Sequence, residues 1–294
     1  MTTTLTGRAR PVLRALHATA GVAVLLLGVS GAQAAAPPLK VCVLVHNAPY
    51  AMHADAPGFD LDTATAVAQK LRRPLEPVWT NNDPEITEID DSDFPVRKLV
   101  RGQCDAIFSM PGPAAATLGQ DPKLALGAPY YGAAFELVGC GGEVPPQMRA
   151  LRSHAIAIQS QTVAHFALLM VKAQPRTYFS IKSALEGIRQ QEAEGGLLWG
   201  PTTGWQLQQS ASGCSFVAGY APPAALRWNQ HVATRSGDAQ LRADIDHALS
   251  ALNQSGDLKR IAARYGVPIY PPFASTYSLG AINDLARVRS GGTE

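Results

Sequence analysis

Short apolar strands alternate with amphipathic helices between residues 40 and 110, and this alternation constrains the fold more than any other feature of the sequence. The β-branched run at 40–45 (KVCVLV) predicts a buried strand, and 58–71 (GFDLDTATAVAQKL) predicts a helix because its apolar residues recur at helical spacing. A strand over 75–80, a short helix over 96–103 and a strand over 104–110 follow. Strands separated by helices in this way predict a parallel sheet with right-handed crossovers.

A second strand–helix series begins after residue 150. We predict strands over 154–160, 196–201 and 214–220, and helices over 163–173 and 183–195. Further along, 241–266 predicts two more helices with a break at Ser255-Gly256, and no regular pattern follows Pro271. Two such series, in roughly 260 residues, are enough for one large domain or for two α/β lobes.

The helix over 58–71 opens with two acids, Asp60 and Asp62. Carboxylates at the start of a helix cap free backbone N–H groups and match the positive end of the helix dipole. We therefore expect these two side chains to define the start of the helix rather than to carry chemistry.

The first 34 residues are typical of a cleaved export signal. A positive start without acids contains Arg8, Arg10 and Arg14, and an apolar core spans 21–29. A small-x-small pattern (AQA) predicts cleavage near Ala34. A membrane anchor is the weaker alternative, because the apolar core is shorter than the roughly 20 residues that span a bilayer.

Removal of this signal leaves a nearly neutral protein. Three of the 25 Lys and Arg residues belong to the signal, so 22 remain against 23 Asp and Glu. This balance argues against a nucleic-acid partner and against a polybasic contact with a membrane.

Four cysteines, Cys42, Cys104, Cys140 and Cys214, lie outside the signal. Their even number in an exported protein favours disulfides, and the absence of a CxxC pair argues against a zinc site. Three pairings are possible, and buried free thiols are the alternative.

Four motifs in order resemble the periplasmic solute-binding proteins of family 3, the two-lobed receptors best known from polar amino-acid import. The motifs are the helix at 58–71, LVRGQCDAIF at 99–108, LGAPYYGAAFELVG at 126–139 and the helical segment at 236–266. The resemblance implies an α/β fold of type II, with two lobes, two crossover hinge strands and a ligand cleft. It places lobe one at 38–135 and 231–280, lobe two at 136–230 and a tail at 281–294.

The same resemblance indicates where the ligand would bind. In the family, loops at the carboxyl ends of strands line the cleft, as in open α/β sheets generally. The candidate ligand contacts are His46, Asn47, Tyr50, Asp91, Asp93, Ser109, Met110, Gly112, Thr117, Gln161, Thr162, Trp199, Gly200 and Thr202. For the loop at 46–50, a turn stabilised by its own side chains is an equal alternative. The acidic segment at 83–93 is more simply a solvated loop than a calcium site.

Three departures from the family pattern bear on the ligand. The arginine that grips a ligand carboxylate in the amino-acid receptors falls at about Thr117 here, and no arginine lies nearby. The helix start in lobe two reads QSQT at 159–162, without the glycine of the family. The acid that holds the ligand amine falls at Gly200. We therefore expect a solute other than an α-amino acid.

Three further motifs, WGPTTGW at 199–205, RGQCDAIFSMPG at 101–112 and PYY at 129–131, resemble a narrower group. These are the accessory J-type proteins found with quinoprotein alcohol dehydrogenases in methanol oxidation. That group shares cysteines at positions matching Cys42 and Cys104, which implies a disulfide between them and leaves Cys140 to pair with Cys214. It has an aromatic and arginine-rich segment where this chain has the acidic segment at 83–93.

No catalytic motif is present in the sequence: neither HExxH, a G-x-S-x-G elbow, a Cys–His pair nor a phosphate-binding glycine loop occurs. We expect a periplasmic monomer that is not an enzyme and that holds no cofactor or metal. Its expected function is to bind a small solute for an inner-membrane permease of an ABC-type importer. The alternative is an accessory role on a periplasmic quinoprotein dehydrogenase.

Overall fold

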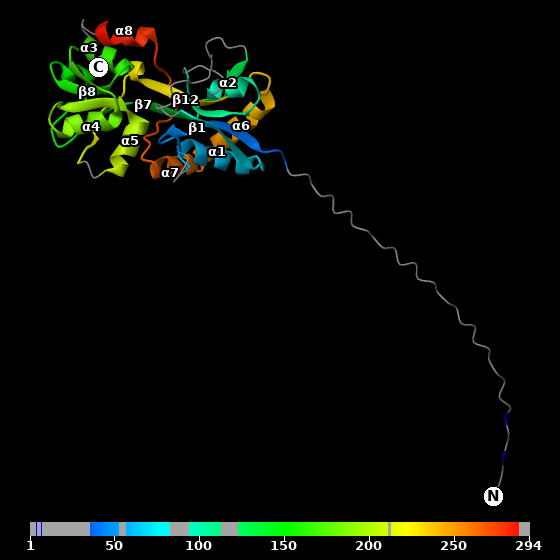
Figure 1. The fold of residues 1–294 in the computed structure, drawn as a ribbon. Helices are drawn as coiled ribbons and strands as arrows, with labels where there is room; N and C mark the ends of the chain where they lie inside the picture. The colour runs from blue at the N-terminus through cyan, green and yellow to red at the C-terminus, as the bar shows by residue number, and fades with distance from the viewer. Residues whose placement is uncertain are drawn as a thin grey trace. The chain divides into compact units, whose positions relative to one another are not determined.

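The computed structural model describes residues 36–52, 57–82, 94–112, 123–210 and 213–287, together with Thr4 and Gly7. The chain separates into two units, Met1–Ala35 and Ala36–Glu294, and the helices and strands below belong to the second (Figure 1). The predicted export signal lies almost entirely outside the described residues. None of the helices in the described ranges is long and apolar enough to cross a membrane.

The first part of the second unit is the predicted alternation of strands and helices. It contains β1 (Leu39–Leu44), α1 (Phe59–Lys70), β4 (Leu75–Thr80), α2 (Pro95–Val100) and β5 (Ile107–Gly112). β1 and β4 pair in parallel, and Val41 forms a parallel bridge with Ala106 just before β5. A short hairpin of β2 (His46–Asn47) and β3 (Ala51–Met52) follows β1. The parallel arrangement predicted for these strands is confirmed.

Two long strands connect this part to the second series. They are β7 (Tyr131–Gly139) and β12 (Arg227–Arg235), which pair with each other in antiparallel orientation. β12 also pairs antiparallel with β5 and with β6 (Leu124–Leu126). These antiparallel pairings add to the predicted parallel arrangement, because the chain returns from the second series and runs against β5.

The second series continues the same sheet from β7. β10 (Gly195–Trp199) pairs antiparallel with β7 and parallel with β8 (Ala155–Gln159), which pairs parallel with β9 (Gln174–Tyr178). β11 (Ser215–Phe216), which pairs with β7, is the short remainder of the strand predicted over 214–220. The helical elements of this series are η2 (Met148–Leu151), α3 (Val163–Met170), α4 (Ile181–Arg189), α5 (Gly200–Gln209) and η3 (Ala224–Leu226).

Three helices complete the chain: α6 (Ala239–Gln254), α7 (Asp257–Arg264) and α8 (Leu279–Arg287). The break between α6 and α7 falls at Ser255 and Gly256, as predicted, and Gly256 adopts φ +73°. α8, in the segment without a sequence pattern, contacts α3 and η3.

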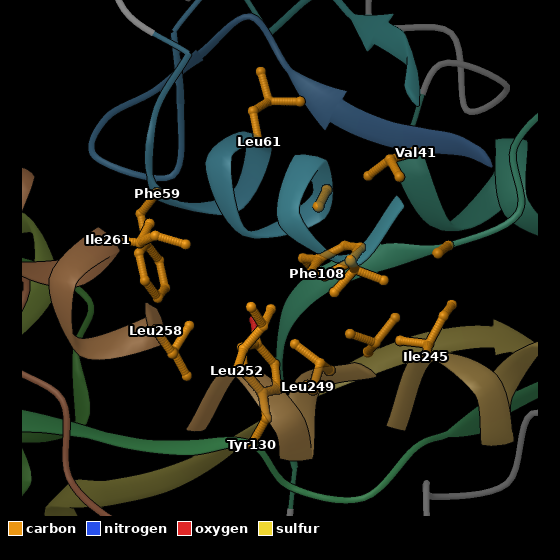
Figure 2. Packing of buried hydrophobic residues seen from close by; sticks show 14 of the residues in the cluster. Val41, Phe59, Leu61, Phe108, Tyr130, Ile245, Leu249, Leu252, Leu258 and Ile261 are labelled. Atoms are coloured by element: carbon orange, nitrogen blue, oxygen red, sulfur yellow. The ribbon is translucent and has the colours of Figure 1, made fainter. Parts of the chain in front are cut away.

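The buried residues form separate clusters for the two series. In the first, Phe59 of α1 and Phe108 of β5 share a cluster with apolar side chains of α6 and α7, including Ile245 and Ile261, and Leu61 lies on the opposite side of α1 (Figure 2). The other large cluster lies around β8, α3 and β10. Such separation is what two lobes require. The limits of the lobes, 38–135 with 231–280 and 136–230, stay predictions.

Each series is crosslinked by one disulfide. Cys42 of β1 is bonded to Cys104, and Cys140 is bonded to Cys214. This is the pairing implied by the resemblance, and the alternative of free thiols is wrong. Closing loops of 62 and 74 residues restricts the unfolded chain and stabilises the fold.

Candidate functional site

The start of α1 is fixed by backbone contacts with the hairpin of β2 and β3. Phe59 and Asp60 donate their backbone N–H groups to the carbonyl oxygens of Pro49 and Tyr50, at 2.7 and 2.8 Å. Gly58 has φ +93°, and a Cβ atom there would lie 2.5 Å from the Tyr50 carbonyl oxygen, so a side chain does not fit. The expected side-chain cap is absent because carbonyl groups of the hairpin already satisfy these N–H groups.

Asp62 contacts α7 instead of capping its own helix. Its Oδ2 accepts a hydrogen bond from Tyr265 Oη at 2.8 Å and pairs with Arg264 Nη2 at 2.7 Å. Tyr265 Oη accepts in turn from the Gly58 N–H group at 3.2 Å. The charge of Asp62 is therefore compensated by an arginine, and the contact joins α1 to α7.

Asp60 is the buried acid of the pair. Ser109 Oγ in β5 donates a hydrogen bond to Asp60 Oδ1 at 2.5 Å. The hydroxyl oxygens of Tyr130 and Tyr131 lie 3.2 and 2.8 Å from the same Ser109 Oγ, and the Ser109 N–H group donates to Tyr130 Oη at 3.1 Å. Ser109 adopts φ +49°, a conformation that L-residues rarely take. The hydrogen-bond network holds Ser109 in this conformation beside one carboxylate.

Burial controls the protonation of this cluster. Desolvation raises the pKa of Asp60 to about 7, and the hydrogen bond from Ser109 opposes part of the rise. Burial also raises the pKa values of Tyr130 and Tyr131 well above the ordinary value, and the nearby Asp60 charge adds to both rises. Tyr50 responds in the same way. The tyrosines therefore stay protonated, while Asp60 titrates near neutral pH.

Asp60 and Ser109 face a cavity of about 430 Å³, which we call the Asp60 cavity. Most of its lining is apolar, and the polar side chains Asn47, Tyr50 and Gln230 join Asp60 and Ser109 in it. The remaining lining residues are Cys42, Val43, Leu44, Ala51, Phe94, Pro95, Val96, Ile107, Phe108, Met110, Pro111 and Trp199. A concave, mostly apolar space with a few polar groups is typical of a small-molecule site.

A second cavity of about 430 Å³, the Lys182 cavity, shares Asn47 and Trp199 with the first. It is more polar than the Asp60 cavity, with a lysine and three side-chain amides. Its lining consists of His46, Asn47, Ala48, Phe135, Gln159, Thr162, Ser180, Ile181, Lys182, Trp199, Thr202 and Gln206. Residues from both strand–helix series therefore meet around it.

Trp199 lies between the two cavities at the end of β10. Its indole Nε1 donates a hydrogen bond to Tyr50 Oη at 2.8 Å, and its ring meets those of Phe135 and Trp228 edge to face. This contact links a residue of the second series to the loop after β1. The neighbouring Trp205 packs against the first core cluster beside Tyr265.

The structure places the predicted contact residues in three groups. Those that line at least one of the two cavities are His46, Asn47, Tyr50, Ser109, Met110, Thr162, Trp199 and Thr202. Gly112, Gln161 and Gly200 line neither of them. Asp91, Asp93 and Thr117 lie outside the described residues. Ligand contact by any of these residues stays a prediction.

Gly200 makes room for a buried acid that the sequence did not single out. A Cβ atom at Gly200 would lie 2.8 Å from Glu136 Cγ and 2.9 Å from the Ala134 carbonyl oxygen. Glu136 lies in β7, and its Oε1 accepts a hydrogen bond from Tyr270 Oη at 2.7 Å. Gly112 similarly makes room for the ring of His231, which a Cβ atom would approach to 2.7 Å.

Two polar residues of the Asp60 cavity were missed as site residues. Asp60 was assigned to the helix start, and Gln230 lies inside β12, where a strand was not predicted. The sequence signal for Asp60 was the GFD motif itself; Gln230 has no comparable signal. Among the described residues, no group of three or more His, Cys, Asp and Glu side chains could hold a metal ion.

No family model matches the sequence, and no curated protein matches it significantly. Solved structures do match the fold. The unliganded, open L-cystine solute receptor of Neisseria gonorrhoeae is 18% identical, with a TM-score of 0.66 over 78% of this chain and 93% of the receptor. MxaJ from Methlophaga aminisulfidivorans is 21% identical, with a TM-score of 0.60 over 79% of this chain and 99% of MxaJ.

The second substrate-binding domain of Lactococcus lactis GlnP, in an open conformation, is 14% identical, with a TM-score of 0.63 over 77% of this chain and 94% of that domain. Each match extends over nearly the whole of the compared structure. The chain therefore has the two-lobed α/β fold of type II periplasmic binding proteins. At these identities the matches establish the fold, and they do not identify the ligand.

Proposed function

We propose that this protein captures a small solute other than an α-amino acid in the cleft between its lobes and delivers it to an inner-membrane permease of an ABC-type importer. The observation that carries this proposal is the pair of adjoining cavities at Asn47 and Trp199. Their linings come from both strand–helix series, as a cleft that closes on a ligand requires. We propose that the solute is bound without being transformed, since the sequence contains none of the catalytic motifs considered above.

The exclusion of α-amino acids rests on the charges around the cavities. Of the described residues, those that line the Asp60 cavity include no Lys, Arg or His, and those that line the Lys182 cavity include no Arg. A bidentate clamp on a carboxylate needs a guanidinium group. Gly200 stands where the family pattern has an acid, and it packs against Glu136.

The location and state of the protein follow from the same proposal. Both disulfides suit an oxidising compartment, and the N-terminal segment is proposed to direct export to the periplasm and to be cleaved near Ala34. We propose that the exported protein is a monomer.

Native mass spectrometry of the protein, released gently from the periplasm of the cells that produce it, tests the cleavage, the monomeric state and the bound solute together. The expected spectrum shows a monomer that is cleaved near Ala34 and carries a bound small molecule. Denaturation releases this molecule, and its mass identifies the solute. A protein without any bound mass, which also fails to bind members of a metabolite library, would contradict the receptor role.

An accessory role on a periplasmic quinoprotein dehydrogenase is the second candidate. It is favoured by the sequence resemblance to the J-type proteins and by the match to MxaJ along nearly all of its length. The same spectra distinguish the two candidates: a stable complex with a dehydrogenase and an empty cleft support the accessory role.

A further inference from the structure

Asp60 is a buried carboxylate whose charge has no partner in the part of the chain that the structure describes. It is 7% exposed, and its described hydrogen-bond partner is the neutral hydroxyl of Ser109. Ion pairs between the described residues include Asp62 with Arg264 but none with Asp60. Transfer of an isolated carboxylate out of water is costly unless a cation or several hydrogen bonds compensate it.

Among the described residues, those that line the Asp60 cavity include no cation, since none of them is a Lys, Arg or His. Two stretches between the elements that build it, 83–93 and 113–122, also contain no Lys, Arg or His, and the short stretch 53–56 contains only His53. A bound molecule can therefore supply the positive charge that a deprotonated Asp60 lacks among the described residues.

Gln230 provides an independent sign that a ligand binds here. Its side chain lines the same cavity, is 2% exposed, and its Nε2 has no hydrogen-bond partner among the described residues. Buried polar groups nearly always have a partner, and a donor left without one in a cavity marks a position for a ligand acceptor.

The rest of the cavity constrains the body of the ligand. Val43, Leu44, Ile107 and Phe108 make apolar walls, and Trp199 and Phe94 add aromatic surface. These side chains favour a compact apolar skeleton, and aromatic faces also attract cations.

We propose that the Asp60 cavity binds a small organic amine, with the protonated amino group paired to Asp60 and a ligand oxygen accepting a hydrogen bond from Gln230 Nε2. The class includes amino alcohols and other compact amines without a carboxylate. This inference rests on the proposed receptor function and names the class of its solute.

The protonation of Asp60 gives the proposal a distinct signature. The titratable and polar groups around this carboxylate are Ser109, Tyr50, Tyr130 and Tyr131, and none of them carries a positive charge. Burial raises the pKa of Asp60 to about 7, and a bound ammonium group would lower it again. Binding near pH 7 should therefore release protons, and affinity should fall as the pH falls below 7.

Isothermal titration calorimetry of the full exported protein tests the proposal. The ligands are matched sets that share one skeleton: amino alcohols with three to six carbons, the corresponding diols and the corresponding hydroxy acids. We expect an amine to bind, with proton release seen as a dependence of the heat on the buffer. Asp60→Asn should weaken its binding at least tenfold, and Gln230→Leu should weaken it several-fold.

The matched control is Asp246→Asn, which changes a half-buried carboxylate on α6 that lines neither cavity and should leave binding unchanged. Circular dichroism melting verifies that each variant is folded. Binding of diols or hydroxy acids that persists in Asp60→Asn would overturn the amine class and leave the receptor function standing. An amine that binds equally well to the wild type and to both cavity variants would overturn this site. No binding by any member, together with an empty protein in native mass spectra, would overturn both.

Discussion

Asp60 and Glu136 are two buried acids in similar electrostatic conditions. Their side chains are 7% and 5% exposed, and burial raises the pKa of each to about 7. Each accepts one hydrogen bond from a hydroxyl group, Asp60 from Ser109 at 2.5 Å and Glu136 from Tyr270 at 2.7 Å. By burial and hydrogen bonding alone, the two carboxylates could not be told apart.

Their surroundings differ. Asp60 lines a cavity, whereas Glu136 lines neither of the two cavities and packs against Gly200. A ligand can reach the first carboxylate, so its cost of burial can be offset when the cavity fills. The second has only protonation and the hydrogen bond from Tyr270 to offset its burial. A raised carboxyl pKa thus indicates a binding group only where an accessible space adjoins it.

The largest expected effect is on the pH dependence of stability. A carboxyl pKa raised by folding means that the native state binds the proton more tightly than the unfolded state. The stabilisation is therefore complete below the unfolded pKa, near 4, and is lost as the pH rises toward the folded value of about 7. Each acid should lower the free energy of unfolding by about 3 kcal/mol at pH 8 relative to pH 4.

Asp60→Asn and Glu136→Gln should each remove one of these losses, which urea denaturation at pH 4, 6 and 8 would measure. The surface variant Glu76→Gln is the control for the loss of one negative charge. A saturating amine should also remove the loss of stability at high pH that Asp60 causes. The loss that Glu136 causes should remain, so the ligand distinguishes the two acids. Equal protection of both by the ligand would refute the distinction.

The next largest effect on stability concerns the close packing of Gly200 against Glu136. Gly200→Ala would bring a methyl group 2.8 Å from Glu136 Cγ and 2.9 Å from a backbone oxygen that cannot easily move. We expect a loss of about 2 kcal/mol in the free energy of unfolding. Adding Glu136→Ala to this variant should restore part of the loss, since it removes one of the two contacts. Urea denaturation of the single and double variants measures the coupling, and full additivity would show that Glu136 does not need the glycine.

The parts of this fold that could be predicted are those with an amphipathic pattern. α1 and the α6–α7 pair have apolar residues at helical spacing, and β4 was predicted with its observed bounds. β7 could not be recognised by alternation, because eight of its nine residues are buried, Glu136 among them, and buried positions do not alternate with exposed ones. α8 follows a segment rich in proline and serine, and it is stabilised by contacts with α3 and η3 that are remote in sequence.

The candidate site divides in the same way. Asn47 and Trp199 end β2 and β10, so their place at the cavities could be predicted from topology, whereas Ser109 lies inside β5. Asp60 could not, because a carboxylate at the start of a helix can turn toward its own N–H groups or toward a neighbouring strand. The choice depends on Pro49 and Tyr50, whose carbonyl groups satisfy those N–H groups first. Such competition for hydrogen bonds is decided by the tertiary structure.

The smallest expected effect comes from the two hydroxyl partners. Tyr270→Phe and Ser109→Ala each remove one hydrogen bond to a buried carboxylate, and each should lower the free energy of unfolding by about 1–2 kcal/mol at pH 8. Both should raise the pKa of the acid concerned, since these bonds favour the charged form. NMR titration of the side-chain carboxyl carbons measures the pKa values directly. Ser109→Gly separates the bond from the backbone, because glycine relieves the strain at φ +49° while losing the same hydrogen bond. If Ser109→Gly and Ser109→Ala are equally unstable, the strain is negligible and Ser109 acts through its hydroxyl group; a more stable glycine variant would show that the protein keeps a strained serine in order to hold Asp60 at the cavity.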